Sequence, residues 1–318
     1  MWTPKEESAA GYADLRLALY GGIKQFVIVL AVGLALKLFV FDSLKVNGSQ
    51  MEPAVKQWDR ILIFKTPYIV PFLKNVSGLS GKPVVISLAD KSASTVMRIA
   101  AVSGDTVNID GGKFYRNGEA VENFSKDTVK YGVIPAGYSQ SDFMGKIRIP
   151  APRDSIDFRT LNMHDFIFAY SVFKQETPGV RLKTHIMVDD TLSGDYMIKD
   201  FSLYHGRLDS IPEELHTDWF FWDRLQSYLN MTAEPEGKKA QLAFSVLKNG
   251  KEVTNFRVKN RYVFVLGDNW SGAKDSRHFG PLPRANITGR AFMTLWGTRL
   301  NDKGKKKLDW GRIVRFVR

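Results

Sequence analysis

The amino-acid sequence predicts a mainly β protein with an N-terminal transmembrane helix and an inserted α+β segment. Three observations support this fold class: a nearly continuous apolar run at 23–41, short runs rich in valine and isoleucine at 42–134 and 246–300, and longer helix-compatible stretches at 135–245. Short β-branched runs bounded by Gly, Asp and Asn are typical of strands and turns. We therefore expect a β domain in two parts, separated by an insertion.

The composition is that of a folded, basic protein without cysteine. Of 318 residues, 44% are hydrophobic and 25% charged, and the formal net charge is +12. A net positive charge is typical of proteins that bind nucleic acid or an anionic membrane surface. Because no zinc-finger, RNP or helix-turn-helix pattern occurs, membrane lipid is the expected partner rather than nucleic acid. The lack of cysteine and the scattered histidines argue against a bound metal, and no cofactor motif is present.

The apolar run at 23–41 is predicted to be a transmembrane anchor. Within it, the run Gln25–Phe41 is at the short end of what spans a bilayer, and Lys37 near the end of this run can extend its ammonium group to the interface. Two alternatives remain open: a buried core helix, or a cleaved signal peptide with Gly33 and Ala35 as its small residues.

Basic residues on both sides of the anchor leave the orientation of the protein in the membrane open. Lys and Arg occur in the N-terminal segment, 1–22, and also after the anchor, so the positive-inside rule is not decisive. The chain ends in a basic segment, 301–318, which is either a solvated tail or a contact with the membrane surface.

Turn residues divide the β domain into hairpins. Asp110–Gly112, Asn117–Gly118 and Asn249–Gly250 each separate two short runs and predict tight hairpin turns. In the insertion, Asp157–Phe173 and Glu213–Leu229 are predicted to be helical, with the second helix starting near Ser210–Glu214. The aromatic run Trp219–Trp222 either packs in the core, its commoner role, or meets lipid or a partner.

Three motifs follow the anchor in a fixed order: Val46–Val55, Val96–Asp105 and Leu266–Arg277. Their order, their spacing and their residues resemble those of bacterial type I signal peptidase, of peptidase family S26. That family removes signal peptides from exported proteins with a serine nucleophile and a lysine base. The residues that match the family motifs are Met51, Pro53, Arg98, Gly104, Asp105, Gly267, Asp268, Asn269, Asp275, Ser276 and Arg277.

The resemblance also implies that the catalytic dyad is substituted. Gln50 stands at the nucleophile position, Met97 at the base position, and Ala273 where the family has a serine that contacts the lysine. A serine attacks only when a base takes its proton, and a lysine is a base only when it is neutral. A carboxamide is no useful nucleophile, and methionine has only the shape of a lysine stem. We therefore expect a protein that keeps the fold of the family but has lost its serine–lysine peptidase chemistry.

Three functions remain open on these grounds. The first is a non-catalytic relative that binds signal peptides or partners an active peptidase paralogue. The second is an active serine endopeptidase with Ser49 as nucleophile and Lys91 nearby, and the third is a membrane-anchored β scaffold unrelated to signal peptides. Asp268, Asp275 and Arg277 are interpreted as a structural network rather than as carboxylate catalysts. We favour the first function, in a single-pass protein of the cytoplasmic (inner) membrane with its main domain on the extracytoplasmic side.

Overall fold

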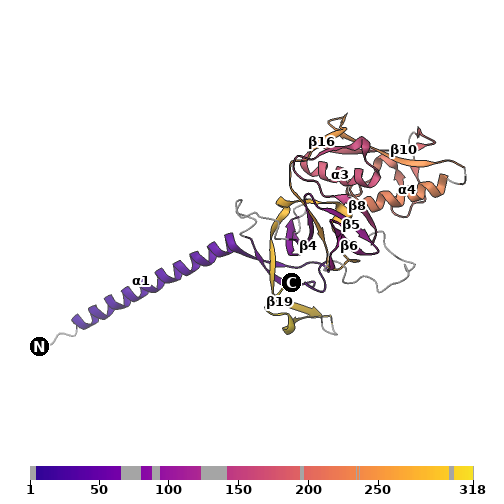
Figure 1. Ribbon diagram of the computed structural model, residues 1–318. Coiled ribbons are helices and arrows are strands. Elements are labelled where there is room, and N and C mark those ends of the chain that lie inside the picture. Colours follow the sequence, from indigo (N-terminus) through magenta and orange to yellow (C-terminus); the bar gives the residue numbers. More distant parts are fainter. Residues whose placement is uncertain are drawn as a thin grey trace.

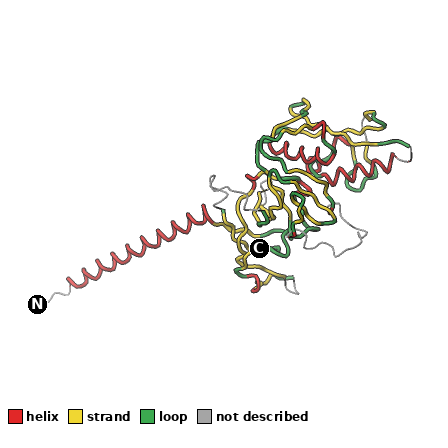
Figure 2. Tube along the Cα trace, in the orientation of Figure 1, coloured by secondary structure: helices red, strands yellow, loops and turns green. Residues whose placement is uncertain are grey.

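The computed structural model confirms a mainly β protein with one long N-terminal helix (Figure 1). Strands and loops form most of the folded part, and further helices lie on the side away from the N-terminal helix (Figure 2). The structure describes residues 5–65, 80–87, 94–122, 142–193, 197–233, 235, 237–300 and 304–317.

The N-terminal helix extends away from the rest of the molecule. Helix α1 (Lys5–Ala35) continues through a π-helical turn, η1 (Leu36–Val40), and leads directly into strand β1 (Phe41–Lys45). The stretch Leu19–Val40 has the length and composition to cross a membrane, and none of its apolar window is buried against the protein. The alternative of a buried core helix is therefore wrong, because the described part of the protein buries none of this apolar window.

One large antiparallel sheet unites strands from both parts of the β domain. Its order is β1-β2-β19-β3-β4-β17-β18, and β20 and β21 also pair with β19. The strands are β1, β2 (Arg60–Phe64), β3 (Pro83–Ser87), β4 (Ser94–Val102), β17 (Tyr262–Leu266), β18 (Leu282–Pro283), β19 (Ile287–Leu300), β20 (Lys306–Asp309) and β21 (Arg315–Phe316). The basic C-terminal segment therefore contributes strands to the sheet, and it is not a free tail.

A second sheet has the order β7-β6-β5-β8. Its strands are β5 (Thr106–Asp110), β6 (Lys113–Arg116), β7 (Glu119–Ala120) and β8 (Met144–Arg148). The predicted hairpins are confirmed: Gly111 and Gly112 join β5 to β6, and Asn117 and Gly118 join β6 to β7, all with positive φ. Asn and Gly adopt positive φ at little cost, which is why these dipeptides make tight turns.

The segment between the two parts of the β domain contains two helices on a further sheet. Helices α3 (Met163–Glu176) and α4 (Trp219–Ala233) pack against the strand pair β10 and β14 (Figure 1). The remaining bounds are β9 (Ser155–Asp157), β10 (Val180–Val188), β11 (Thr191–Ser193), β12 (Met197–Ile198), β13 (Gly206–Arg207), β14 (Ala240–Lys248), β15 (Lys251–Glu252) and β16 (Asn255–Arg257), with 3-10 turns at Phe158–Thr160, Leu208–Ser210, Glu213–Leu215, Arg284–Asn286 and Trp310–Arg312 and a short helix α5 (Ser276–Phe279).

Both predicted helices begin later than the sequence pattern suggested. The first starts at Met163 because the side chain of Asn162 caps it, accepting a hydrogen bond from the N–H of Asp165. The second starts at Trp219, where the carboxylate of Asp218 accepts hydrogen bonds from the first N–H groups, while the stretch after Pro212 forms only a 3-10 turn. Capping side chains stabilise a helix by about 1 kcal/mol, enough to decide its start.

The aromatic run at the start of α4 lies in the core. Trp222 is fully buried, and Trp219 and Phe221 are nearly so. These side chains belong to one continuous cluster that also includes Phe114 of β6 and Phe264 of β17. Each buried aromatic side chain contributes on the order of 2–3 kcal/mol. The helices of the insertion are therefore joined to the β domain by a shared hydrophobic core.

Candidate functional site

The first motif is a turn between β1 and β2 that is anchored in the core. Val46 accepts a hydrogen bond from the N–H of Trp58, and it donates one to the carbonyl of Asp59, which closes the turn at its base. Met51 and Val55 are buried beneath the turn at 1% and 0% exposure. These two side chains hold the neighbouring position 50 at a fixed place on the surface of the sheet.

The first and third motifs meet at Gly267. The N–H of Asn269 donates to the backbone oxygen of Gln50 at 3.0 Å, and its Nδ2 donates to the carbonyl of Ser49 at 3.2 Å. A Cβ atom at position 267 would lie 2.3 Å from the Cβ of Ala273 and 2.6 Å from the backbone oxygen of Gln50. Only glycine allows this close approach, so the structure brings positions 50 and 273 together around it.

The second and third motifs are joined by strand pairing and by an ion pair. Strand β4 runs antiparallel to β17, with Arg98 opposite Leu266. The guanidinium of Arg98 donates to both carboxylate oxygens of Asp268, at 2.7 and 2.6 Å, and to the carbonyl of Gly81 at 2.7 Å. Bidentate, charge-assisted pairs of this kind are strong and directional. This pair fixes the start of the third motif relative to Met97, the neighbour of Arg98 in β4.

Met97 lies in an apolar part of the core whose other buried members are aliphatic. Its side chain is 1% exposed, and it shares a buried cluster with Val84, Ile86, Ile99, Val263, Val265, Leu282 and Ile287. The Nε2 of Gln50 lies 3.5 Å from the hydroxyl of Thr95. Because alternate residues of a strand share a face, Thr95 and Met97 point to the same side of β4. The side chain of Gln50 therefore reaches toward the face of β4 that holds Met97.

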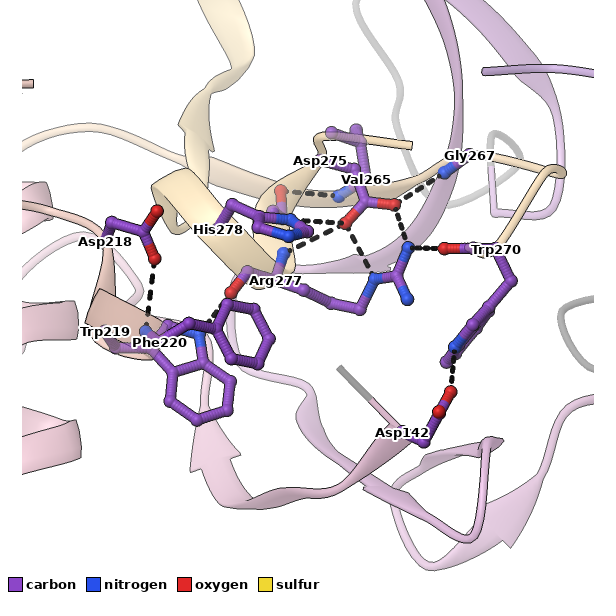
Figure 3. Close-up of polar contacts among 11 residues, drawn as sticks. Asp142, Asp218, Trp219, Phe220, Val265, Gly267, Trp270, Asp275, Arg277 and His278 are labelled. Carbon is purple, nitrogen blue, oxygen red and sulfur yellow. Dashed lines mark hydrogen bonds and ion pairs between the residues drawn. The ribbon is translucent and has the colours of Figure 1, made fainter. Parts of the chain in front are cut away.

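Asp275 and Arg277 form a buried ion pair beneath the site (Figure 3). Both side chains have 0% exposure. Asp275 accepts hydrogen bonds from the N–H of Gly267 and from the backbone and side chain of Arg277, at 2.9 to 3.1 Å. The guanidinium also donates to the carbonyl of Trp270 and lies 4.2 Å from the centre of that ring. These bonds remain within the third motif, which supports the structural interpretation of both residues.

The insertion contacts this network from the other side, which the sequence did not indicate. The indole N–H of Trp219 donates to the carbonyl of Arg277, and the ring of Phe220 packs 4.9 Å from that of His278 (Figure 3). Burial lowers the pKa of His278, although nearby Asp275 opposes this shift. The aromatic run at the start of α4 was assigned only to the core or to a contact with lipid or a partner, so its contact with the third motif was not predicted.

The remaining motif residues support turns. Asp105 accepts hydrogen bonds from the N–H of Val102 and from the side chain of Asn117, and Gly104 beside it has a positive φ of 95°. The hydroxyl of Ser276 accepts a hydrogen bond from the N–H of Val265 at 2.9 Å. Pro53 is exposed in the first turn. Lys91 lies outside the described residues.

Comparison with known proteins identifies the family. The profile of "Signal peptidase, peptidase S26" matches residues 20–152 and 217–296. The chain belongs to this signal peptidase family. The match includes most of the apolar helix and all three motifs, and it leaves out 153–216, which lies inside the predicted insertion. Family membership and the exposed apolar helix together indicate a membrane-anchored protein.

The chain is also similar to individual members of the family. It is 24% identical over 133 residues to signal peptidase I of Bacillus licheniformis, which covers 42% of this chain and 69% of that protein. It is 26% identical over 127 residues to signal peptidase I of Bacillus amyloliquefaciens, covering 40% and 65%. Over a short stretch of 39 residues, which covers 12% of each chain, it is 51% identical to thylakoidal processing peptidase 1 of Arabidopsis thaliana.

Proposed function

We propose that this protein is a non-catalytic member of the signal peptidase family that binds the extended C-terminal region of signal peptides. It does so beside an active signal peptidase, with its main domain on the extracytoplasmic side of the cytoplasmic membrane. The observation that carries the proposal is the pair Gln50 and Met97, at the positions of the family nucleophile and base.

The surroundings of Met97 support the loss of the base. An amine at this position would be enclosed by aliphatic side chains. In an active enzyme such a setting keeps a lysine neutral, so that it can accept the proton of a serine. Methionine fills the same volume and accepts no proton. Ala273 likewise has no hydroxyl that would hold a lysine, so all three substitutions point in the same direction.

Two strand edges beside the first motif support peptide binding. Among the described strands, β1 pairs only with β2. Strand β4 pairs with β17 only from Arg98 onward, so Ser94–Met97 has no partner among these strands on that side. Leu44 of β1 and Thr95 of β4 line the same narrow gap. An extended peptide adds to strand edges through main-chain hydrogen bonds, which require no catalytic dyad.

The proposal is tested with purified full-length protein in detergent and a preprotein that carries a small-x-small cleavage site. We expect no processing after prolonged incubation, as judged by mass spectrometry of the products. Specific cleavage that disappears in the Ser49→Ala variant would overturn the proposal and support Ser49 as nucleophile.

A matched variant shows whether the assay can detect peptidase activity in this protein scaffold. Gln50→Ser, Met97→Lys and Ala273→Ser together restore the three family residues within the network that joins the motifs. We expect slow but specific processing by this triple variant, because serine, base and contact hydroxyl then occupy neighbouring positions. The variant with Met97→Lys alone serves as the negative control.

A further inference from the structure

The gap between the β1 edge and the first residues of β4 is closed in this structure. Leu44 and Val46 line one side, Thr95 and Val96 line the other, and the space between them has no room for a water molecule. A bound strand lies about 4.8 Å from each neighbouring strand, so a peptide here would need the two edges to stand about 10 Å apart with an empty space between them. Something must move before a peptide can enter.

The side chain of Gln50 lies across this gap. Its Nε2 reaches the hydroxyl of Thr95 on the far side at 3.5 Å, a long and therefore weak hydrogen bond. Its Oε1 folds over Gly48, where an added Cβ would lie only 2.3 Å from that oxygen. The backbone of Gln50, in contrast, is fixed by the N–H of Asn269. The backbone of the turn is thus held in place, whereas among the described residues the carboxamide of Gln50 is held by one weak hydrogen bond and by its contact with Gly48.

We propose that Gln50 is a gate on the peptide site, so that an extended peptide binds only when this carboxamide swings out of the gap. The inference rests on the proposed function, since it concerns access to the same site. Serine, the family residue here, has one carbon and one oxygen beyond its Cα, and it is too short to span the gap. Glutamine in place of serine at position 50 therefore removes the nucleophile and also closes the gap between β1 and β4.

The gate has a quantitative consequence for affinity. When only a fraction of the molecules is open, the apparent Kd equals the intrinsic Kd divided by that fraction. Because the bond is weak, its loss corresponds to about a twofold change in such an equilibrium. Gln50→Ala, Gln50→Ser and Thr95→Val should each increase the open fraction, because each removes one partner of the contact. Gln57→Ala, in an exposed part of the same turn, is the matched control.

Thiol labelling tests the gate without any peptide. The chain has no cysteine, so one can be introduced alone. In the full-length protein in detergent, Leu44→Cys places a thiol at the gap, and Lys45→Cys places one on the exposed side of the same strand. We expect a maleimide to label the Leu44→Cys variant about twofold faster when Gln50→Ala is also present, with no change for Lys45→Cys. Equal labelling of Leu44→Cys in both backgrounds would overturn the gate.

Peptide titration then separates the gate from the proposed function. The probe is a synthetic signal peptide with an Ala-x-Ala end, and binding is followed by tryptophan fluorescence. We expect Gln50→Ala to bind about twofold more tightly than the parent, and Gln57→Ala to bind as the parent does. Saturable binding with equal or weaker affinity in Gln50→Ala would overturn the gate and leave the proposed function intact. Absence of binding to the parent and to every open variant up to millimolar peptide would overturn both.

Discussion

Two substitutions at Met97 test whether the base position is dry and apolar. Met97→Leu keeps the volume and polarity of a side chain that is 1% exposed among aliphatic residues, so it should cost less than about 1.5 kcal/mol. Met97→Lys introduces an amine into the same cluster. Neither Gln50 nor Ala273 has a hydroxyl that could accept a hydrogen bond from this amine. The buried amine must then lose its proton or remain as an unpaired charge.

The cost of Met97→Lys depends on pH in a predictable direction. Burial disfavours the charged form and lowers a lysine pKa from about 10.4, here by about 2–3 units, and each unit corresponds to about 1.36 kcal/mol. The folded state then binds fewer protons than the unfolded state, so the penalty is largest below the folded pKa and disappears near the unfolded pKa. The expected loss is about 3–4 kcal/mol at pH 7 and about 1 kcal/mol at pH 9.5.

The assay is urea unfolding of the full-length protein in detergent, followed by tryptophan fluorescence for the parent and both variants at pH 7 and pH 9.5. The Met97→Leu variant controls for packing, because its loss should be the same at both pH values. If Met97→Lys is as stable as Met97→Leu at pH 7, position 97 does not lie in an apolar pocket. Its assignment as the base position would then be wrong, and the argument for lost catalysis would rest on Gln50 alone.

Three further predictions concern the scaffold and the anchor. Gly267→Ala should lower the free energy of unfolding by about 1–3 kcal/mol, since its Cβ would clash with Ala273 and with the backbone of the first motif, and Ala273→Gly should recover part of this loss in denaturant titrations. Arg312→Ala should cost about 3–5 kcal/mol in the same assay, because it leaves the fully buried carboxylate of Asp59 without its cation; a loss below 1 kcal/mol would show that the pair is solvated. Protease added to intact spheroplasts should digest the domain that follows 23–41, whereas full protection would refute the extracytoplasmic orientation.

Features that depend on neighbouring residues could be read from the sequence. Asp110–Gly112 and Asn117–Gly118 specify their hairpins because the turn conformation is set by those residues alone. The anchor was visible because spanning a bilayer requires a long apolar run, although the helix begins well before 23–41. The motif residues could be assigned to one site because the residues of the three motifs and their order along the chain are specific.

Features that depend on distant residues could not be predicted. The pair of Arg98 and Asp268 joins residues 170 positions apart, and the pair of Asp59 and Arg312 joins residues 253 positions apart. No local pattern indicates which of 45 basic side chains meets a given carboxylate. The reach of Gln50 to Thr95 has the same origin, because it appears only when β1 and β4 are brought together in the folded sheet.

The central claim, binding without cleavage, is tested most directly by one experiment on the full-length protein. A signal peptide is equilibrated with the protein in detergent, separated from it after saturation, and weighed by mass spectrometry. Our account predicts saturable binding and recovery of the peptide at its original mass. Recovery of fragments cut after the small-x-small end would contradict the account, and so would the absence of saturable binding up to millimolar peptide.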